Sequence, residues 1–227
     1  MRSFNSVIFV VVFVASILPI QANESDPMDQ KSNDSLQLIR VFVAEKEKND
    51  ALVVCYARDN ANSPWRQEIA PMPAKIGRDG LGDPDALAER FVKLPFGEWD
   101  LGFVFGTASE PPKGVTIPYR QVTDVDYWID ESFSPLYNHW VSGPEPSDSH
   151  EKLAAYPIRY ELSLVMLCNV HPTLPEKGSA IFLHVWLNPD HPTGGCVALD
   201  RENVIKILRW LKSNKRPRIR TELGSPE

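Results

Sequence analysis

The sequence predicts a mainly β protein of one domain, with short helices and a single well-defined helix near the C-terminus. Proline, at 20 residues against 12 glycines in 227, breaks helix interiors and central strands, which excludes a long helical bundle. Short apolar runs separated by turn-forming residues are typical of strands. One late stretch has the 3.6-residue apolar spacing of an amphipathic helix.

The composition agrees with a folded protein, since 43% of the residues are hydrophobic and 24% are charged. This excludes a mainly disordered chain, a collagen-like repeat and a protein with many membrane spans. The 24 Lys and Arg residues against 30 Asp and Glu give a net charge of -6. An acidic chain without a dense basic block does not fit a nucleic-acid partner.

Residues 1–22 have the pattern of a secretory signal. Arg2 precedes the apolar run Val7–Leu18, which Pro19 ends, and Ala22 is a small residue at the expected cleavage position. The alternative is an N-terminal membrane anchor. We expect an exported protein, not inserted in the membrane once the signal is cleaved. We expect the rest of the chain to consist of a flexible leader at 23–36, one domain at 37–222 and a tail at 223–227.

Six apolar runs are expected to form strands, the first two as a hairpin. They are Gln37–Ala44, Ala51–Ala57, Trp65–Ala70, Tyr160–Val170, Ala180–Leu187 and a short strand around Ile219. A glycine-rich loop is expected at Ile76–Pro84 and a short helical turn at Ala86–Val92.

The helix is expected at Asp200–Lys212. Asp200 suits the N-cap, and Val204, Leu208 and Leu211 fall on one apolar stripe. This stripe would pack against the strands.

Two of the three cysteines, Cys55 and Cys168, lie in apolar runs and are expected to be buried thiols, with a disulfide between them left open. Cys196 has a different setting, because it follows two glycines just before the expected helix. Glycines let the backbone approach a ligand closely, as an oxyanion site requires.

His184 ends an apolar run upstream of Cys196, and cysteine with histidine is a recurring nucleophile–base pair. A competing interpretation is a zinc site built from His184, His191 and Cys196. It lacks the CxxC and HExxH spacings that usually accompany such sites. The sequence also has no GxSxG elbow, P-loop or dinucleotide fingerprint.

Two segments resemble the catalytic motif of the L,D-transpeptidase (YkuD-type) family. They are Gly178-Ser179-Ala180-Ile181-Phe182-Leu183-His184 and Pro192-Thr193-Gly194-Gly195-Cys196-Val197-Ala198-Leu199. Further similarity lies in Leu94–Gly102, Pro118–Gln121, Ser134–Asn138 and at Asn169. The resemblance spans roughly residues 41–219.

The resemblance implies a β-sandwich L,D-transpeptidase-like domain that acts on peptidoglycan stem peptides in cell-wall synthesis. Cys196 would be the nucleophile, His184 its proton acceptor and donor, Gly195 an oxyanion-binding backbone group, and Thr193 a support of the loop. A thioester would form with release of D-alanine, and an amine from a second stem would resolve it as a 3→3 crosslink. The resemblance also implies a location in the periplasm or cell envelope, and it implies no metal and no organic cofactor.

Four further residues, Tyr119, Arg120, Asn138 and Asn169, are expected to contact the substrate or to support the site, Arg120 by pairing with a stem carboxylate. Departures from the motif, such as Gly194 before the Gly-Cys pair and Ala198 after it, bear on substrate preference. Two alternatives stay open. One is a carboxypeptidase or amide hydrolase with the same Cys–His site, and the other is a non-catalytic wall-binding protein.

Overall fold

The computed structural model describes residues 34–83 and 92–226. The expected signal, most of the leader and the helical turn expected from residue 86 up to residue 91 lie outside these ranges. The described chain is mainly β, as expected. Its largest sheet contains β1 (Gln37–Val43), β2 (Asp50–Ala57), β3 (Arg66–Lys75), β6 (Gly97–Gly106), β7 (Tyr119–Gln121), β11 (Leu162–Met166), β12 (Phe182–Val185), β13 (Val197–Leu199) and β14 (Arg218–Leu223).

This sheet closes on itself. Its strand order is β11-β12-β13-β3-β2-β1-β14-β6-β7, and β11 also pairs with β6, so that eight of the nine strands form a ring and β7 is attached outside it. The long strand β6 makes the closure possible, because its first half pairs with β14 and its second half with β11. The expectation of two stacked sheets was therefore wrong, and the domain is a closed barrel.

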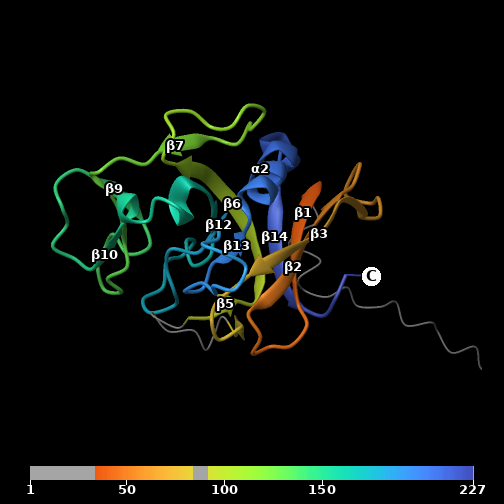
Figure 1. The fold of residues 1–227 in the computed structure, drawn as a ribbon, viewed down its shortest axis with the longest axis horizontal. Coiled ribbons are helices and arrows are strands. Elements are labelled where there is room, and N and C mark those ends of the chain that lie inside the picture. The colour runs from red at the N-terminus through yellow and green to blue at the C-terminus, as the bar shows by residue number, and fades with distance from the viewer. Residues whose placement is uncertain (1–33, 84–91, 227) are drawn as a thin grey trace, which may run out of the picture.

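The hairpin expected at the start of the domain is confirmed, since β1 and β2 pair antiparallel. β1 also pairs in parallel with β14, which brings the two ends of the described chain together. In Figure 1 these strands stand side by side, with β1 in orange and β14 in blue. The expected strand at Trp65–Ala70 is longer in the structure, because β3 continues through Pro71 and Pro73 to Lys75.

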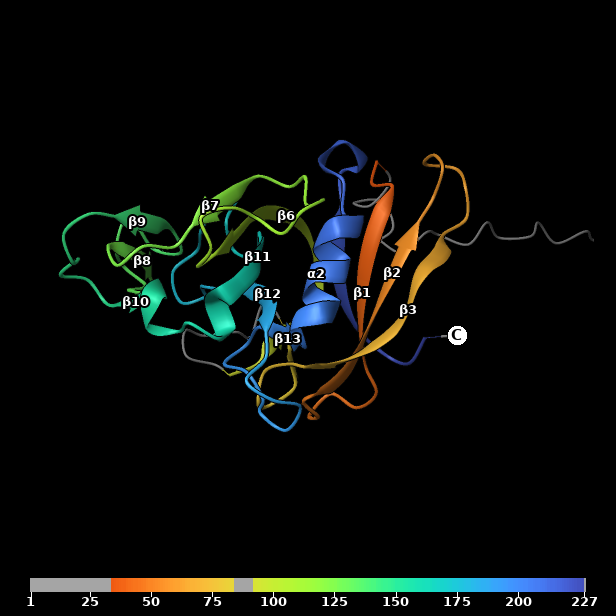
Figure 2. The ribbon, with the colours of Figure 1, turned by 45° about the horizontal axis from the view of Figure 1, so that its top comes forward.

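The helix α2 (Arg201–Trp210) is confirmed at its predicted place. Oδ1 of Asp200 accepts the N–H of Asn203 at 2.9 Å and so caps its first turn. The predicted stripe of Val204, Leu208 and Leu211 is fully buried. Figure 2 shows α2 lying between β1 on one side and β11 and β12 on the other.

None of the helices within the described ranges has the length and apolarity needed to cross a bilayer. Apart from α2, the helical segments of the described residues are single 3-10 turns at Leu153–Ala155, Arg159–Glu161 and Ser213–Lys215.

A separate three-stranded sheet stands beside the barrel. It consists of β8 (Asp126–Ile129), β9 (Trp140–Ser142) and β10 (His150–Lys152), in the order β10-β8-β9. Figure 1 shows it at the left, on the opposite side of the molecule from β1–β3. A two-stranded sheet joins β4 (Leu81–Gly82) to β5 (Leu94–Pro95).

The apolar side chains form two clusters on opposite faces of β11, β12 and β13. One cluster holds Leu183, Val197 and Leu199 with the apolar side of α2. The other holds Phe182 and Cys196. Successive side chains of a strand point to opposite faces of the sheet. Since Val197 points toward α2, Cys196 points to the other face of the barrel wall, toward the three-stranded sheet.

Candidate active site

Cys196 and His184 lie on neighbouring parallel strands. In the register of β12 and β13, Leu183 is opposite Val197 and His184 is opposite Ala198. Cys196 directly precedes β13, so it falls beside Phe182, one pleat away from His184 on the same face. The sequence predicted that this histidine and this cysteine come together, and the strand register brings them to one face.

Both residues line a cavity of about 230 Å³ between the barrel and the three-stranded sheet. The segments 178–181, 184–187 and 191–198 supply most of its wall. The other lining residues are Lys93, Pro95, Asp130, Glu151, Arg159 and Tyr160. The cavity therefore combines the two motif segments with charged side chains from elsewhere in the chain.

The thiol of Cys196 is held between two backbone groups. Its Sγ accepts the N–H of Phe182 at 3.4 Å and donates to the carbonyl of Ala180 at 3.2 Å. The residue is 8% exposed, and burial raises the pKa of the thiol to about 12, although the Phe182 N–H opposes this rise. At neutral pH the resting group is a thiol, not a thiolate.

The imidazole of His184 is also neutral at neutral pH. It is 4% exposed, and burial lowers its pKa from 6.5 to about 4. Its Nδ1 lies 2.8 Å from the carbonyl oxygen of Val185, which can only accept a hydrogen bond. Nδ1 therefore carries the proton, and Nε2 has the lone pair that can take a proton from a nucleophile. The ring edge of Tyr160 packs on the imidazole, with ring centroids 6.0 Å apart.

The loop before Cys196 is fastened by Thr193. The Thr193 hydroxyl donates to the carbonyl of Cys196 at 2.7 Å and accepts the N–H of Gly195 at 3.1 Å. The Thr193 backbone in turn bonds to Ile76 and Arg78 of the glycine-rich loop. The hydroxyl thus connects the two ends of the Gly194–Gly195 turn.

Gly195 is required by its backbone conformation. Its φ is +138°, and a Cβ at this position would meet the carbonyl oxygen of Lys93 at 3.1 Å. Its N–H donates to Thr193 in this structure, so an oxyanion-binding role for this amide stays a prediction.

The side-chain amides of Asn138 and Asn169 are both engaged in hydrogen bonds within the chain, so the two residues support the site and do not contact a substrate through these amides. Oδ1 of Asn138 accepts from Trp128 Nε1 at 3.0 Å and from the N–H of Ala180 at 3.1 Å. Its Nδ2 donates to the carbonyls of Cys168 and Asn169 at 3.0 and 2.9 Å. Asn138 therefore fixes the segment whose carbonyl accepts the Cys196 thiol.

Asn169 braces the next loop by the same kind of contact. Its Nδ2 donates to the carbonyls of Leu174 and Gly178, and its Oδ1 accepts the N–H of Leu174. Both asparagines have left-handed φ values, 57° for Asn138 and 52° for Asn169, which asparagine tolerates better than most residues.

Tyr119 and Arg120 do not line the cavity. Tyr119 Oη donates to the carbonyl of Ala108 at 2.6 Å. Arg120 donates to Ser142 Oγ at 2.6 Å, lies 3.7 Å from Asp126 Oδ1 and stacks on Trp140. The charge of Arg120 is thus paired within the chain, and the structure does not bring it to Cys196.

The residues that the sequence reasoning missed include four charged ones of the cavity wall, Lys93, Asp130, Glu151 and Arg159. Asp130 follows β8, Glu151 belongs to β10, and Arg159 begins a 3-10 turn. No motif marks them, because they come from segments far from the Cys196 and His184 motifs in sequence. Tyr160 was missed for the same reason, and its hydroxyl donates to Glu151 Oε2 at 2.6 Å.

All three cysteines are free thiols, so Cys55 and Cys168 are not bridged. Among residues 34–83 and 92–226, no group of three or more His, Cys, Asp or Glu side chains is placed to hold a metal ion. The competing zinc interpretation, with His184, His191 and Cys196 as ligands, is therefore not supported by the arrangement of these residues.

Comparison of the chain with protein-family models, with curated proteins and with solved structures found no match. The resemblance to the L,D-transpeptidase family thus depends on the motif residues, and the geometry of the cavity is independent of it.

Proposed function

We propose that this chain is an exported cysteine acyltransferase of the L,D-transpeptidase type that acts on peptidoglycan stem peptides. The single observation that carries the proposal is the position of Cys196 and His184 on one face of adjacent strands, in the wall of one cavity. The tautomer of His184 adds support, because its unprotonated Nε2 is the atom a general base requires.

In the first half-reaction, Cys196 Sγ attacks the carbonyl carbon of the third stem residue. Its proton passes to His184 Nε2, the S–C bond forms, and the carbonyl oxygen becomes an oxyanion. The C–N bond then breaks, and His184 returns the proton to the leaving amine, which departs as D-alanine. A thioester on Cys196 and a neutral imidazole remain.

In the second half-reaction, an amine of another stem attacks the thioester carbonyl. The amine gives its proton to His184, the new C–N bond forms and the C–S bond breaks, and Cys196 takes the proton back. Because both resting groups are neutral, the proton moves together with the attack, and no preformed ion pair is needed. Water in place of the amine gives a carboxypeptidase, which is an alternative outcome of the test.

The test is incubation of the purified protein with a disaccharide-tetrapeptide, followed by intact mass of the protein and analysis of the products. We expect a covalent adduct on Cys196 with loss of D-alanine, and then a crosslinked dimer. Release of D-alanine without a dimer would favour the hydrolase.

Two cysteine variants make the test specific. Cys196→Ala should abolish both adduct and product. Cys168→Ala removes a second buried thiol, whose pKa burial also raises to about 12 and which does not line the cavity, and it should leave both unchanged. The absence of any Cys196-dependent adduct would overturn the proposal and favour a wall-binding protein.

A further inference from the structure

A second cavity lies beside the Cys196 cavity, on the same face of the large sheet, and we call it the β3 groove. Its volume is about 410 Å³. Its apolar wall is formed in part by Phe42, Leu52, Pro73 and Trp186. Lys75 of the groove wall is paired with Ala198, which is itself paired with His184. Residues paired across neighbouring strands point to one face, so the groove and the candidate catalytic pair share a surface.

Trp186 lies between the Cys196 cavity and the β3 groove and lines both of them. Its backbone N–H donates to the carbonyl of Leu199 at 2.8 Å, so the pairing of β12 with β13 continues beyond Val185. Because Trp186 is two residues from His184, their side chains point to the same face, roughly 7 Å apart along the strand. A ligand that lies on Trp186 can therefore extend to the catalytic pair.

The indole of Trp186 is not used by the fold. Four of the other five tryptophans belong to the two apolar clusters or pack against them, and the fifth, Trp65, lies under the guanidinium of Arg58 at 4.4 Å. Trp186 belongs to neither cluster. Within the described ranges no other ring or cation packs on its indole, and its Nε1–H has no hydrogen-bond acceptor. A half-buried indole of this kind is a platform for a ligand with one apolar face and a hydrogen-bond acceptor.

The charges in the wall of the β3 groove neutralise each other. Among the described residues, its charged side chains are Asp50 and Lys75, whose Oδ1 and Nζ are 2.6 Å apart. Lys75 Nζ also lies 3.4 Å from Oδ1 of Asn49. The groove therefore matches a neutral ligand whose rings have apolar C–H faces and whose edges carry hydroxyl and amide groups. These are the features of an N-acetylated pyranose.

The position of Trp186 relative to Cys196 fits the length of a stem peptide. Cys196 lies beside Phe182, and Trp186 is four residues further along the strand, which is roughly 13 Å. In the proposed donor the reacting carbonyl belongs to the third residue, and three extended residues span roughly 10 Å. The sugar that carries the stem follows beyond the first residue, through a lactyl group, so it falls at the level of Trp186.

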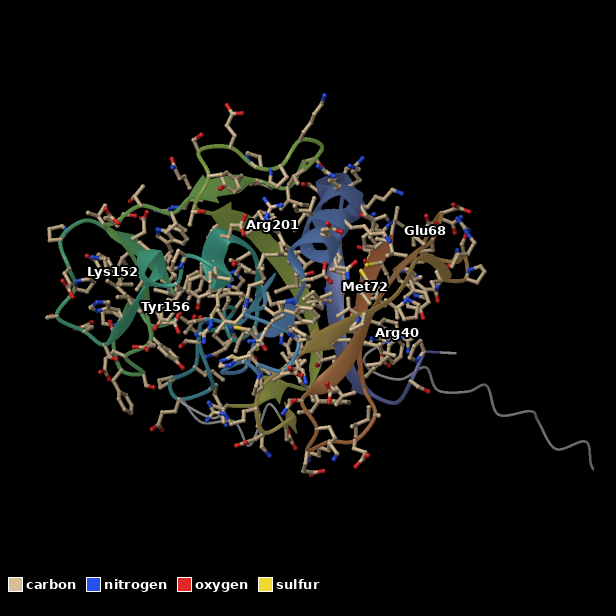
Figure 3. All side chains as sticks on the ribbon, in the orientation of Figure 1. Arg40, Glu68, Met72, Lys152, Tyr156 and Arg201 are labelled. Atoms are coloured by element: carbon tan, nitrogen blue, oxygen red, sulfur yellow. The ribbon has the colours of Figure 1, made fainter. Side chains whose placement is uncertain are left out.

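The β3 groove leads away from the three-stranded sheet. Figure 3 labels Tyr156 on the side of that sheet, and Arg40 of β1 and Met72 of β3 on the other side. Phe42 and Pro73 of the groove wall belong to these same two strands. A glycan in the groove therefore lies against β1–β3 and not against the three-stranded sheet.

We infer that the β3 groove binds the N-acetylated glycan of the acyl donor, with a sugar ring stacked on the indole of Trp186 while the stem peptide extends to Cys196. The inference rests on the proposed function, because it assigns a binding site to the glycan part of the same donor. Trp186 lies between the two segments that carry the resemblance and belongs to neither of them. The groove thus makes the protein select stems that are attached to glycan over free peptides.

The test compares two acyl donors that share the same tetrapeptide. One is the disaccharide-tetrapeptide. The other is the tetrapeptide with an acetylated N-terminus, which keeps the amide at the first residue but lacks the sugars. The measured quantity is the ratio of their kcat/KM values for formation of the Cys196 acyl-enzyme. For the unmodified protein we expect the disaccharide to increase kcat/KM by about tenfold, because of the stacking and the apolar area that it buries.

Four variants show whether the groove causes this preference. Trp186→Leu removes the flat ring and should make the two donors equal, whereas Trp186→Phe keeps a smaller ring and should keep part of the preference. Leu52→Ala removes an apolar contact of the groove outside the Cys196 cavity and should also lower the ratio. Trp65→Leu is the matched control, because it makes the same change at a ring outside the groove, and it should leave the ratio unchanged. Damage to the catalytic pair would lower both kcat/KM values and leave their ratio unchanged.

Equal kcat/KM for the two donors in the unmodified protein, with acylation intact, would overturn this inference and leave the proposed function standing. An apolar peptide would then be the better occupant of the groove. A preference that survives both Trp186→Leu and Leu52→Ala would also overturn the inference. The absence of acylation by either donor would overturn the proposed function as well, so the two failures are distinguishable.

Discussion

The N–H of Ala180 donates to Oδ1 of Asn138 at 3.1 Å, while the carbonyl of the same Ala180 accepts the thiol of Cys196 at 3.2 Å. Ala180 has a φ of 53° and Asn138 a φ of 57°, so both have a left-handed backbone that costs an L-residue free energy. The hydrogen bond of Asn138 holds this conformation in place, and through it the position of Cys196.

Substitution of Asn138 by alanine should strongly destabilise the protein. The change leaves Trp128 Nε1, Ala180 N–H and the carbonyls of Cys168 and Asn169 without their partner. Each buried polar group left unpaired costs about 1–3 kcal/mol, so for four such groups we expect a loss of at least about 4 kcal/mol in the free energy of unfolding. Urea unfolding measures it.

Two other substitutions separate the cost of the lost hydrogen bonds from the cost of the left-handed backbone. Asn138→Gly also removes the side chain but relieves the left-handed backbone, so it should be less destabilising than Asn138→Ala by about 1 kcal/mol. Asn138→Asp keeps an acceptor for Ala180 and loses the two donated bonds. A loss below about 1 kcal/mol for Asn138→Ala would contradict the supporting role.

The two adjacent glycines before Cys196 should respond differently to alanine. A Cβ on Gly195 would meet Lys93 O at 3.1 Å and Ile181 Cδ1 at 3.4 Å, at a φ of +138° that L-residues rarely adopt. A Cβ on Gly194 would meet nothing within 4 Å. We expect Gly195→Ala to lower the free energy of unfolding by about 1–3 kcal/mol, and Gly194→Ala to change it by no more than about 0.5 kcal/mol.

Thermal or urea unfolding of the two variants side by side is the measurement. Since both substitutions add the same methyl group, the comparison isolates the backbone strain and the contact with Lys93. Equal stability of the two variants would show that the loop adjusts freely.

The parts of the fold that the sequence predicted are those encoded by local pattern. The apolar runs of β1 and β2, joined by a charged turn, and the capped stripe of α2 need only neighbouring residues, and both the hairpin and the helix are confirmed. The length of β3 was underestimated because Pro71 and Pro73 usually end a strand. The structure tolerates them because β3 meets β13 in a single residue pair, Ala198 with Lys75, and is otherwise open on that side.

The rest depends on pairings between distant segments. Closure of the barrel needs β6 to pair with both β14 and β11, which no local pattern reveals. The same holds for the cavity wall: Cys196 and His184 were found by chemistry and motif, whereas Asp130 and Arg159 enter through the fold.

His184 is buried as a neutral imidazole, so we expect it to lower the free energy of unfolding in acid. Its pKa is about 4 in the folded state and 6.5 when unperturbed, so between these values the unfolded chain binds a proton that the folded chain does not. Stability is therefore highest above pH 6.5 and falls as the pH drops toward 4. The contribution of this one residue is roughly 3 kcal/mol.

Urea unfolding at several pH values from 7 to 4 measures this slope. His184→Gln cannot take up the proton, so its stability should fall less over the same range. The difference between the two proteins removes the contribution of the carboxylates. Parallel pH profiles would mean that His184 is not buried as a neutral imidazole.

The neutral state of Cys196 can be tested by alkylation. With a pKa of about 12 and 8% exposure, the thiol should react with iodoacetamide at pH 7 at least about a hundredfold more slowly than an exposed cysteine. The rate should rise steadily with pH up to about 10, because only the thiolate reacts. Peptide mapping by mass spectrometry follows Cys196 separately from Cys55 and Cys168.

The His184→Gln variant is the matched control for this measurement. If a thiolate–imidazolium pair existed at rest, the rate would level off below pH 8 and the variant would lose that plateau. If both groups are neutral, the two proteins should show the same steep rise, because the imidazole then contributes no charge to the thiol. A plateau near neutral pH in the unmodified protein alone would therefore contradict proton transfer coupled to attack.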